Sequence, residues 1–330
     1  MNNENIIFLG GHRKSGTTML LNLIDGHPEV CVYPTDIAIL YAYFPVWTAD
    51  GVNISERLDR LDRVLFGTLS KIHNRHKLGE LLPVEKIREH FWAELEREKA
   101  HEIVSVIGQI MKSYRLITNQ SIEEKPFFAF KETSLEIYAC ELGDQFPNAK
   151  FIQLIRDPRD NMGALRAGVD RHYKNLGEDE RHILASLIHR IGISLRLHDS
   201  NLLKLGQNRF KSLTFERLVS SPEGVGRDIA DFAGWQFSEC MKKTTIMGVA
   251  TRGNNYEGDP FMEITRQNVA RWRDRITEFE AKVIEFHLGD LMERHGYELA
   301  FAHSEAAAAA SEFYKWTNYK FFFNDSFGEK

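Results

Sequence analysis

Hydrophobic and polar positions along the chain follow two recurring patterns. Short runs rich in aliphatic and aromatic residues are typical of buried strands, and they fall at residues 6–9, 31–33, 127–130, 150–155 and 210–214. Longer segments with apolar residues at helical spacing follow these runs, for example at residues 178–201 and 277–293. The alternation predicts an α/β fold with a central parallel sheet flanked by helices.

Two stretches depart from this alternation. Residues from about 50 to about 120 read as polar helix with little strand signal, which predicts a helical cap inserted into one domain over residues 1–330. Their charged runs are typical of solvated helix faces. The tail from about 305 to 330 is rich in aromatic residues, so we expect it to dock on the body of the chain or on a second copy in a homo-oligomer.

A glycine-rich turn follows the first predicted strand and opens a helix. In that geometry the backbone N–H groups of residues 15–18 have no partner inside the helix and lie at the positive end of its dipole. Gly11 and Gly16 allow the turn to close and a ligand to approach the backbone. The turn therefore predicts an anion site, with a merely solvated basic bend as the alternative.

The turn differs from the usual nucleoside triphosphate loop in the place of its lysine. Gly11 and Gly16 have the spacing of G-x-x-x-x-G-K-[ST], but Thr17 stands where the lysine belongs. A lysine occurs inside the loop instead, at Lys14. Since the usual lysine neutralises the β- and γ-phosphates beside magnesium, this shift predicts a different phosphate-like ligand.

Charged residues follow three further predicted strands. Asp36 comes shortly after one strand, Lys131 and Glu132 directly follow another, and Arg156 follows a third. Ligands of open α/β sheets gather at these carboxyl ends, so we expect the four side chains near the loop. For Asp36, the N-cap of a helix over residues 37–43 is an equally supported role. For Arg156, the alternative is an ion pair with a neighbouring aspartate.

Composition narrows the class of protein. The chain has 330 residues, 43% of them hydrophobic, and a net charge of −5, so it has no general attraction to nucleic acid or anionic membranes. Three widely spaced cysteines indicate neither a disulfide framework nor a metal cluster. Since the first residues contain no signal or membrane-spanning segment, a natural start at Met1 would make the protein cytoplasmic.

Residues 13–18, Arg-Lys-Ser-Gly-Thr-Thr, resemble the 5′-phosphosulfate loop of sulfotransferases, which use 3′-phosphoadenosine 5′-phosphosulfate (PAPS) as donor. Three later segments resemble that family in the same order. Residues 151–160 are similar to its 3′-phosphate segment, residues 215–219 to its aromatic-Glu-x-Leu-Val element, and residues 271–273 to its basic-Trp element. Four ordered matches span most of the chain.

The resemblance implies roles for particular residues. Those implied to bind PAPS or its product, adenosine 3′,5′-bisphosphate, are Arg13, Lys14, Ser15, Gly16, Thr17, Thr18, Arg156, Phe215, Arg271 and Trp272. Trp272 stacks on the adenine or simply packs, with neither favoured. The implied catalytic residues are Lys14, which stabilises the departing 5′-phosphate, Asp36, which takes the acceptor proton, and Lys131, which assists at the sulfuryl oxygens.

The chain departs from the family pattern at two places. Ala164 stands where a serine is common eight residues after the 3′-phosphate arginine, and Arg166 or Arg271 is expected to compensate. Residues 131–133 read Lys-Glu-Thr where many cytosolic members have Lys-Thr-His, so their catalytic histidine is absent. Tyrosylprotein and some bacterial members instead use a glutamate within about one residue of the position of Asp36, and Glu132 is the second choice of base.

The expected reaction is in-line transfer of the sulfuryl group from PAPS to the hydroxyl or amine of an acceptor that the sequence does not identify. No metal is expected, because basic residues meet the charge of the leaving nucleotide. The competing classes are a P-loop kinase, which should bind ATP with magnesium, and a nucleotide-binding module without catalysis.

Overall fold

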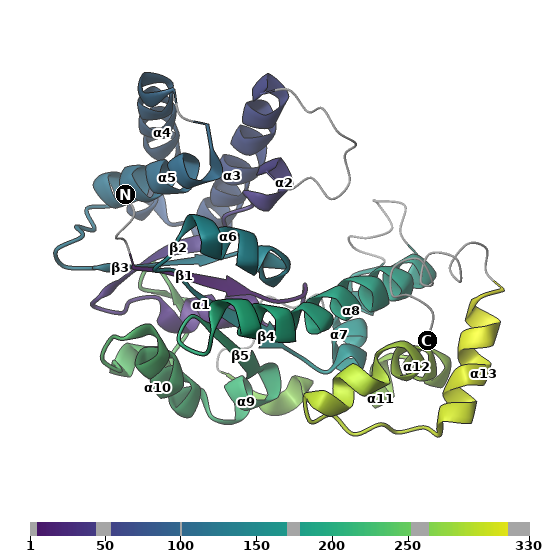
Figure 1. Ribbon diagram of the computed structural model, residues 1–330. Helices are drawn as coiled ribbons and strands as arrows, with labels where there is room; N and C mark the ends of the chain where they lie inside the picture. Colours follow the sequence, from purple (N-terminus) through teal and green to yellow (C-terminus); the bar gives the residue numbers. More distant parts are fainter. Residues whose placement is uncertain (1–4, 44–53, 100, 170–178, 252–263, 316–330) are drawn as a thin grey trace.

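The computed structural model describes residues 5–43, 54–99, 101–169, 179–251 and 264–315, which contain a five-stranded parallel sheet (Figure 1). The strand order is β2-β3-β1-β4-β5, and every pairing in it is parallel. The strands are β1 (Asn5–Gly10), β2 (Val30–Asp36), β3 (Phe127–Lys131), β4 (Lys150–Ile155) and β5 (Phe210–Thr214). All five coincide with predicted runs, so the predicted α/β sheet is confirmed.

Strand β2 is longer than its sequence indicates. The predicted run covers residues 31–33, yet β2 continues through Pro34 to Asp36. The position of β2 at the sheet edge and the irregular register between Val32 and Asp36 explain the difference, since edges and bulges tolerate a missing N–H. The next helix, α2 (Leu40–Tyr43), begins four residues after Asp36. The predicted helix over residues 37–43 therefore begins three residues later than expected, and Asp36 is not its cap.

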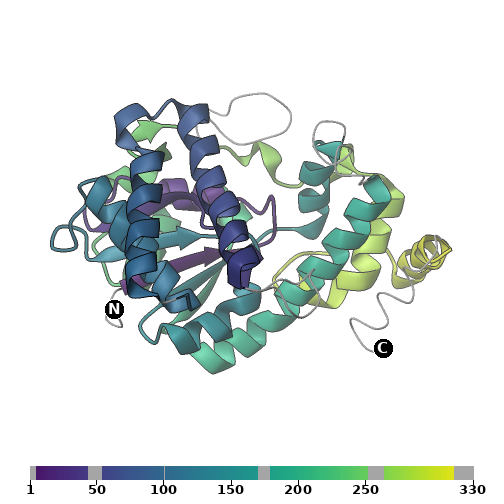
Figure 2. The same cartoon turned by 90° about the horizontal axis from the view of Figure 1, so that it is seen from above.

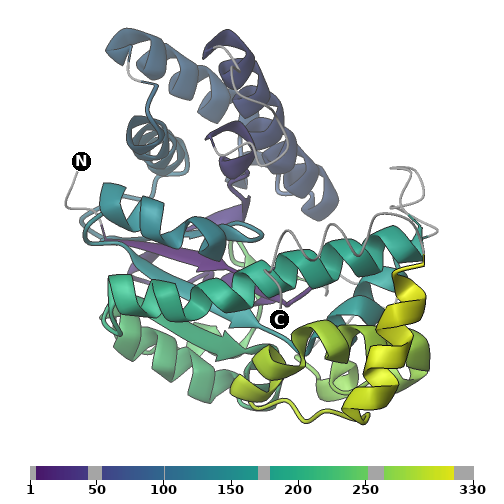
Figure 3. The same cartoon turned by 45° about the vertical axis from the view of Figure 1, so that its right-hand side comes forward.

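Helices cover both faces of the sheet (Figures 1 and 3). On one face Ile7 and Leu9 of β1 pack with α1 (Thr17–Ile24), α9 (Phe215–Ser220) and α10 (Pro222–Ala233). On the other face Ile6 and Phe8 pack below α6 (Ala139–Gln145), and α8 (Glu180–Leu205) runs beside it. The alternation of side chains along the central strand thus divides the core into two layers.

The cap consists of three helices between β2 and β3, namely α3 (Ile54–His76), α4 (Val84–Glu98) and α5 (Ile103–Ile117). Figure 2 shows them over the sheet. Their apolar residues share one cluster with the sheet, in which the ring of Phe8 stacks on those of Phe130 and Phe151. The predicted inserted helical cap is confirmed, and it packs as part of the main core.

A third apolar cluster joins the helices of the C-terminal part to α7 (Pro158–Arg166) and α8. These helices are α11 (Trp272–Arg275), α12 (Glu278–Arg294) and α13 (His303–Phe313) (Figure 3). Phe313 is fully buried in this cluster, so the tail docks on the body of the chain as far as α13. The aromatic residues beyond residue 315 lie outside the described residues, and the homo-oligomer stays a prediction.

Short elements complete the described ranges. They are the antiparallel pair β6 (Thr245–Ile246) and β7 (Val249–Ala250) and the 3-10 turns η1 (Gly79–Leu81), η2 (Leu135–Tyr138), η5 (Glu239–Lys242) and η6 (Arg266–Asn268). Of the helices in these ranges, none combines the length and the apolar composition that crossing a bilayer requires.

A leucine-to-alanine substitution at a buried and at an exposed position tests the assignment of the core. Leu23 is fully buried in α1, whereas the side chain of Leu203 in α8 is 88% exposed. We expect Leu23→Ala to lower the free energy of unfolding by about 2–5 kcal/mol, since it removes buried methyl groups and leaves a cavity. Leu203→Ala should change it by less than about 0.5 kcal/mol. Urea titration of both variants measures the difference, and equal losses would contradict the core assignment.

Candidate functional site

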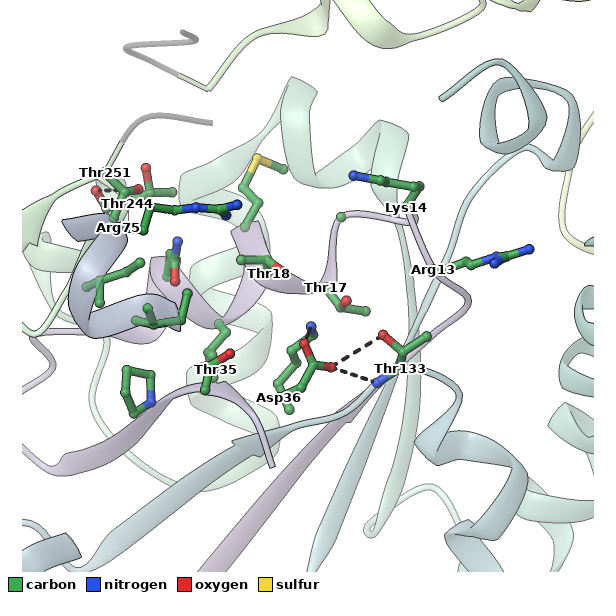
Figure 4. A pocket seen from close by; sticks show the side chains of 18 of the residues that line it. Arg13, Lys14, Thr17, Thr18, Thr35, Asp36, Arg75, Thr133, Thr244 and Thr251 are labelled. Atoms are coloured by element: carbon green, nitrogen blue, oxygen red, sulfur yellow. Dashed lines mark hydrogen bonds and ion pairs between the residues drawn. The ribbon is translucent and has the colours of Figure 1, made fainter. Parts of the chain in front are cut away.

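A cavity of about 1030 Å³ opens at the carboxyl ends of the strands. Its wall combines the loop after β1, the ends of β2, β3 and β4, one face of α3 and the β6–β7 pair (Figure 4). This is where the order of a parallel sheet places ligands, because the chain leaves β1 toward β2 on one side and leaves β3 toward β4 on the other. Its volume lies at the upper end of the range for ligand pockets, so it has room for more than one small molecule.

The loop after β1 depends on two glycines. Gly11 has a φ of +146°, and a Cβ there would lie 2.5 Å from the carbonyl oxygen of Leu154. Gly16 has a φ of +98°, and a Cβ there would lie 2.6 Å from the ring of Phe215. Neither position accepts a side chain without a shift of the surrounding chain. Thr17 and Thr18 then begin α1, and their N–H groups have no carbonyl inside the helix to bond.

Buried polar contacts hold the loop to α7. The Nδ2 of Asn161 donates to the hydroxyl of Ser15, and its Oδ1 lies 3.1 Å from Nδ1 of His12. The N–H of Ser15 donates to the carbonyl of His12 at 3.0 Å. The prediction that the N–H of Ser15 faces the anion is therefore wrong, because that group closes the turn. Ser15 stabilises the loop from behind, and it is not among the residues that line the cavity.

Lys14 and Arg13 point in different directions. Lys14 lines the cavity from a left-handed backbone conformation with a φ of 67°. Burial, followed by the charges of Arg75, Lys131 and Arg156, lowers the pKa of Lys14 to about 8. Arg13 lies at the cavity edge and extends away from the other labelled residues (Figure 4), with its Nη2 3.4 Å from the hydroxyl of Ser186 in α8. Lys14 is thus the cation of the loop that an anion would meet.

Arg156 lines the cavity although its side chain is almost fully buried. Its Nη1 donates to the carbonyl of Lys14 and its Nη2 to the carbonyl of Asn268. The guanidinium lies 4.3 Å from the ring centroid of Phe215, which also lines the cavity. Its Nε is buried without a hydrogen-bond partner among the described residues. Burial lowers the pKa of Arg156 from its usual value.

Among the described residues, Arg156 forms no ion pair with a neighbouring aspartate, which was the alternative role. Arg159 takes that role, with its Nη2 2.7 Å from a carboxylate oxygen of Asp157 and its Nη1 2.5 Å from Glu285. Asp160 accepts from the N–H groups of Ala270 and Trp272 instead. Both aspartates are thus engaged elsewhere, and Arg156 faces the cavity.

Arg271 and Trp272 lie apart from the cavity. Trp272 is 5% exposed within the C-terminal cluster, and the guanidinium groups of Arg159 and Arg273 lie over its ring. Arg271 bonds to the side chain of Asn268. Neither is among the residues that line the cavity, so the geometry supports packing for Trp272 and gives no support to either residue as a nucleotide contact.

Ala164 lacks the hydroxyl that is common in the family, and the arginines predicted to compensate for it do not line the cavity. Ala164 lines the cavity, but Arg166 pairs with Glu280 outside it. Arg275 lines the cavity and lies against Gly163, where a Cβ would come within 3.0 Å of its own Cβ. The compensating role predicted for Arg166 or Arg271 is therefore not supported, and Arg275 is the arginine that lies against α7 in the cavity wall.

Asp36 at the end of β2 and Lys131 at the end of β3 form an ion pair in the cavity wall. They are opposite one another in the pairing of β2 with β3, and the Nζ of Lys131 lies 2.6 Å from Oδ2 of Asp36. Thr133 donates to Oδ1 from its N–H and its hydroxyl (Figure 4). The carboxylate is still 34% exposed and both partners line the cavity. The structure thus brings a held carboxylate and a cation to one point beside Lys14.

Glu132, the second choice of base, faces the other way. Its carboxylate accepts from the N–H of Leu40 at the start of α2, and the residue is fully buried outside the cavity lining. Burial, with a smaller contribution from the charge of Asp36, raises the pKa of Glu132 well above its usual value. This geometry makes Glu132 a helix cap and leaves Asp36 as the carboxylate that faces the cavity.

The sequence pattern of the sulfotransferase family matches residues 6–239, which is more than half of the chain. The chain belongs to the sulfotransferase family. Chicken (Gallus gallus) protein-tyrosine sulfotransferase 2 is 25% identical over 238 residues, which cover 72% of this chain and 53% of that protein. The chain therefore spans about half of the length of this curated relative.

The solved sulfotransferase domain from the curacin biosynthetic pathway has the same fold, with a TM-score of 0.62 at 18% identity. The match covers 91% of this sulfotransferase chain and 100% of the other. The confirmed fold and family agree with the resemblance carried by the four sequence segments.

Sequence reasoning missed several residues that line the sulfotransferase cavity. Thr133 lines the cavity and directly follows Lys131 and Glu132. Its position after a strand end was the feature of the sequence that could have predicted this. Lys71 and Arg75 project from α3, where the sequence analysis assigned charged residues to solvated helix faces. Their spacing of four residues marked a common face, but nothing in the sequence tells which face meets the sheet.

The lowered pKa of Lys14 predicts how anion binding changes with pH. A bound anion favours the protonated amine, so binding should be tightest below pH 8 and weaken above it, by up to about tenfold per pH unit. Calorimetry of adenosine 3′,5′-bisphosphate between pH 7 and pH 9.5 measures this slope. Lys14→Arg should abolish the slope because a guanidinium stays charged throughout. A pH-independent dissociation constant in the unsubstituted protein would contradict the role given to Lys14.

Proposed function

We propose that this sulfotransferase uses PAPS and transfers its sulfuryl group to the hydroxyl or amine of an acceptor. The observation that carries the proposal is the single cavity in which Lys14 lies between Arg156 on one side and the Asp36–Lys131 pair on the other. A donor with phosphate at both ends needs two separated basic sites. The transfer also needs a base that takes the proton of the acceptor substrate. The side chains at the strand ends supply all three.

The residues at the two basic sites fit the charges of PAPS. At one end the first N–H groups of α1 and the side chain of Lys14 face an anion, which suits the 5′-phosphosulfate. At the other end Arg156 offers a buried Nε that has no partner among the described residues, which suits the 3′-phosphate. Phe215 and Ala164 line the wall beside Arg156 and offer apolar surface to the nucleoside.

PAPS supplies an activated sulfuryl group when it is bound. Asp36 takes the proton of the acceptor as the acceptor oxygen or nitrogen forms its bond to sulfur. Lys14 stabilises the charge that the 5′-phosphate oxygen gains as its bond to sulfur breaks. Lys131 holds Asp36 in place through their ion pair and lies where it can also contact a sulfuryl oxygen. Thr133 fixes the second carboxylate oxygen, so the base keeps one orientation.

The acceptor class is a separate question. The chicken relative is named for protein tyrosine, and it is about twice as long as the segment that this chain matches. The cap supplies one wall of the cavity on the side of Asp36, so we propose that α3 helps to select the acceptor.

Arg156→Ala tests the assignment of the donor site. We expect the dissociation constant of adenosine 3′,5′-bisphosphate to rise about tenfold to a hundredfold, since the variant removes a charged hydrogen-bond donor worth about 1.5–3 kcal/mol. Arg166→Ala is the matched control, because Arg166 pairs with Glu280 outside the cavity and should leave binding unchanged. ATP with magnesium should bind more weakly than the bisphosphate. Tighter binding of the triphosphate with magnesium would favour the kinase.

Asp36→Asn and Glu132→Gln separate the two candidate bases. We expect Asp36→Asn to lower transfer from labelled PAPS to acceptors of a cell extract by about 10²–10⁴-fold, the usual contribution of a general base. Its affinity for adenosine 3′,5′-bisphosphate should stay within about twofold. Glu132→Gln should retain most of the activity, because that side chain faces α2. Normal transfer by Asp36→Asn would remove Asp36 as the base, and bisphosphate binding without transfer in any assay would favour the binding module.

A further inference from the structure

One face of α3 forms a basic wall of the cavity. Thr68, Lys71, Ile72, Arg75 and His76 line the cavity at the spacing of a single helix face, and Lys77 follows at the helix end. Figure 4 shows Arg75 beside Thr244 and Thr251, on the side of the cavity away from Arg13. Lys71, Arg75 and Lys77 are exposed, so their charged groups are accessible to a ligand. We call these three residues the α3 basic wall.

The α3 basic wall has no acidic counterpart in the described part of the cavity. Eight lysine and arginine residues line the cavity in this part of the chain, and Asp36 is the one carboxylate among the described lining residues. Asp36 is already paired with Lys131. Within the described residues, no carboxylate lies within 4.0 Å of the charged groups of the wall. The acidic residues of α3, which are Glu56, Asp59 and Asp62, all belong to its first half.

A basic helix end also has a structural explanation, since cations near the C-terminus of a helix interact favourably with its dipole. That explanation accounts for the number of basic residues in the last turns of α3. It does not account for their direction, because a residue at any position around the last turn would interact with the dipole equally well. Lys71 and Arg75 instead share the face that carries Thr68, and this face meets the cavity.

The α3 basic wall lies at a fixed distance from the proposed base. The hydroxyl of Thr68 donates to the main-chain carbonyl of Asp36 at 3.2 Å, which fixes α3 to the end of β2. At 1.5 Å of rise per residue, Lys71 and Arg75 are about 5 Å and about 10 Å further along the helix. After burial, the charge of Arg75 is the strongest influence that lowers the pKa of Lys14. The wall therefore begins next to the proposed transfer point, and the charge of Arg75 also acts on Lys14 of the loop.

We propose that the acceptor carries an anionic group besides its reacting hydroxyl or amine, and that Lys71 and Arg75 bind this group while Asp36 faces the reacting atom. The inference rests on the proposed function and names its acceptor class. A cleft lined by one sign of charge raises the local concentration of oppositely charged ligands and repels those of like charge. Arginine meets a carboxylate, sulfate or phosphate with two hydrogen bonds. The neutral wall of Thr244 and Thr251 contacts the remainder of the acceptor.

Matched acceptors that differ only in charge test the inference. One set is 4-hydroxyphenylacetate, its primary amide and tyramine, and a second is glucuronate with glucose. The two sets show whether the anionic acceptor is an aromatic compound or a sugar. With labelled PAPS at equal acceptor concentrations, the anionic member of a set should be sulfated at least about tenfold faster than the neutral member. The cationic member should be the slowest.

The double variant K71Q/R75Q should reduce this preference to about one, while its dissociation constant for adenosine 3′,5′-bisphosphate stays within about twofold. R63Q is the matched control, because Arg63 is an exposed residue of the same helix outside the cavity lining. It should keep the full preference. Where no set gives turnover, the comparison uses calorimetry of 4-hydroxyphenylacetate with the bisphosphate-saturated protein. Binding by the unsubstituted protein that is lost in K71Q/R75Q supports the inference.

Three results would overturn the inference. They are equal turnover of anionic and neutral members, absence of both turnover and binding for every anionic member, and a loss of bisphosphate affinity in K71Q/R75Q as large as in R156A. The last result would assign the wall to the donor. Failure of the proposed function is seen separately, as a protein that does not bind the bisphosphate at all.

Discussion

The buried guanidinium of Arg156 is the contact on which the arrangement of the site depends. It joins three segments that are far apart in the sequence, because it bonds the carbonyl of Lys14 in the first loop, bonds the carbonyl of Asn268 after β7 and stacks on Phe215 after β5. Phe215 in turn contacts Gly16, where no Cβ can be accommodated. The two ends of the proposed donor site are therefore not independent. The arginine proposed to face the 3′-phosphate also fixes the backbone of the loop proposed to face the 5′-phosphosulfate.

The cap is coupled to the same core. Its helices share one apolar cluster with the sheet, and the hydroxyl of Thr68 joins α3 to the last residue of β2. The side of the cavity proposed for the acceptor thus depends on the packing that stabilises the fold. A change in the interior of the cap would alter both stability and the position of the α3 basic wall, whereas changes on its outer face should alter neither.

The fold was predictable from the sequence because the strand runs, the glycine turn and the helical cap each carry a local signal. The shared location of four charged residues was also predictable, since parallel strands bring their carboxyl ends to one edge of the sheet. These residues are Lys14, Asp36, Lys131 and Arg156. The directions of side chains were not. Ser15 faces α7 and Trp272 faces the C-terminal core because of partners that are distant in the sequence, namely Asn161 and Arg159.

The length of β2 shows a second limit of local reasoning. Proline cannot donate to a sheet ladder, and both the edge position of β2 and the irregular register between Val32 and Asp36 accommodate Pro34. The extension by three residues is what sets Asp36 opposite Lys131 and not at the start of a helix. Similarly, Glu132 has the composition of a base but the surroundings of a cap. Local sequence identified both candidate carboxylates, and tertiary contacts show that Asp36 faces the cavity whereas Glu132 is buried against α2.

The attachment of the first loop to α7 through Ser15, His12 and Asn161 has a kinetic consequence. A loop whose shape is fixed by buried contacts before a ligand arrives loses little conformational entropy on association. Nucleotide capture should then resemble the docking of rigid bodies, with one fast phase and no slow isomerisation afterwards. Slow steps in turnover would in that case belong to the exchange of acceptor and product.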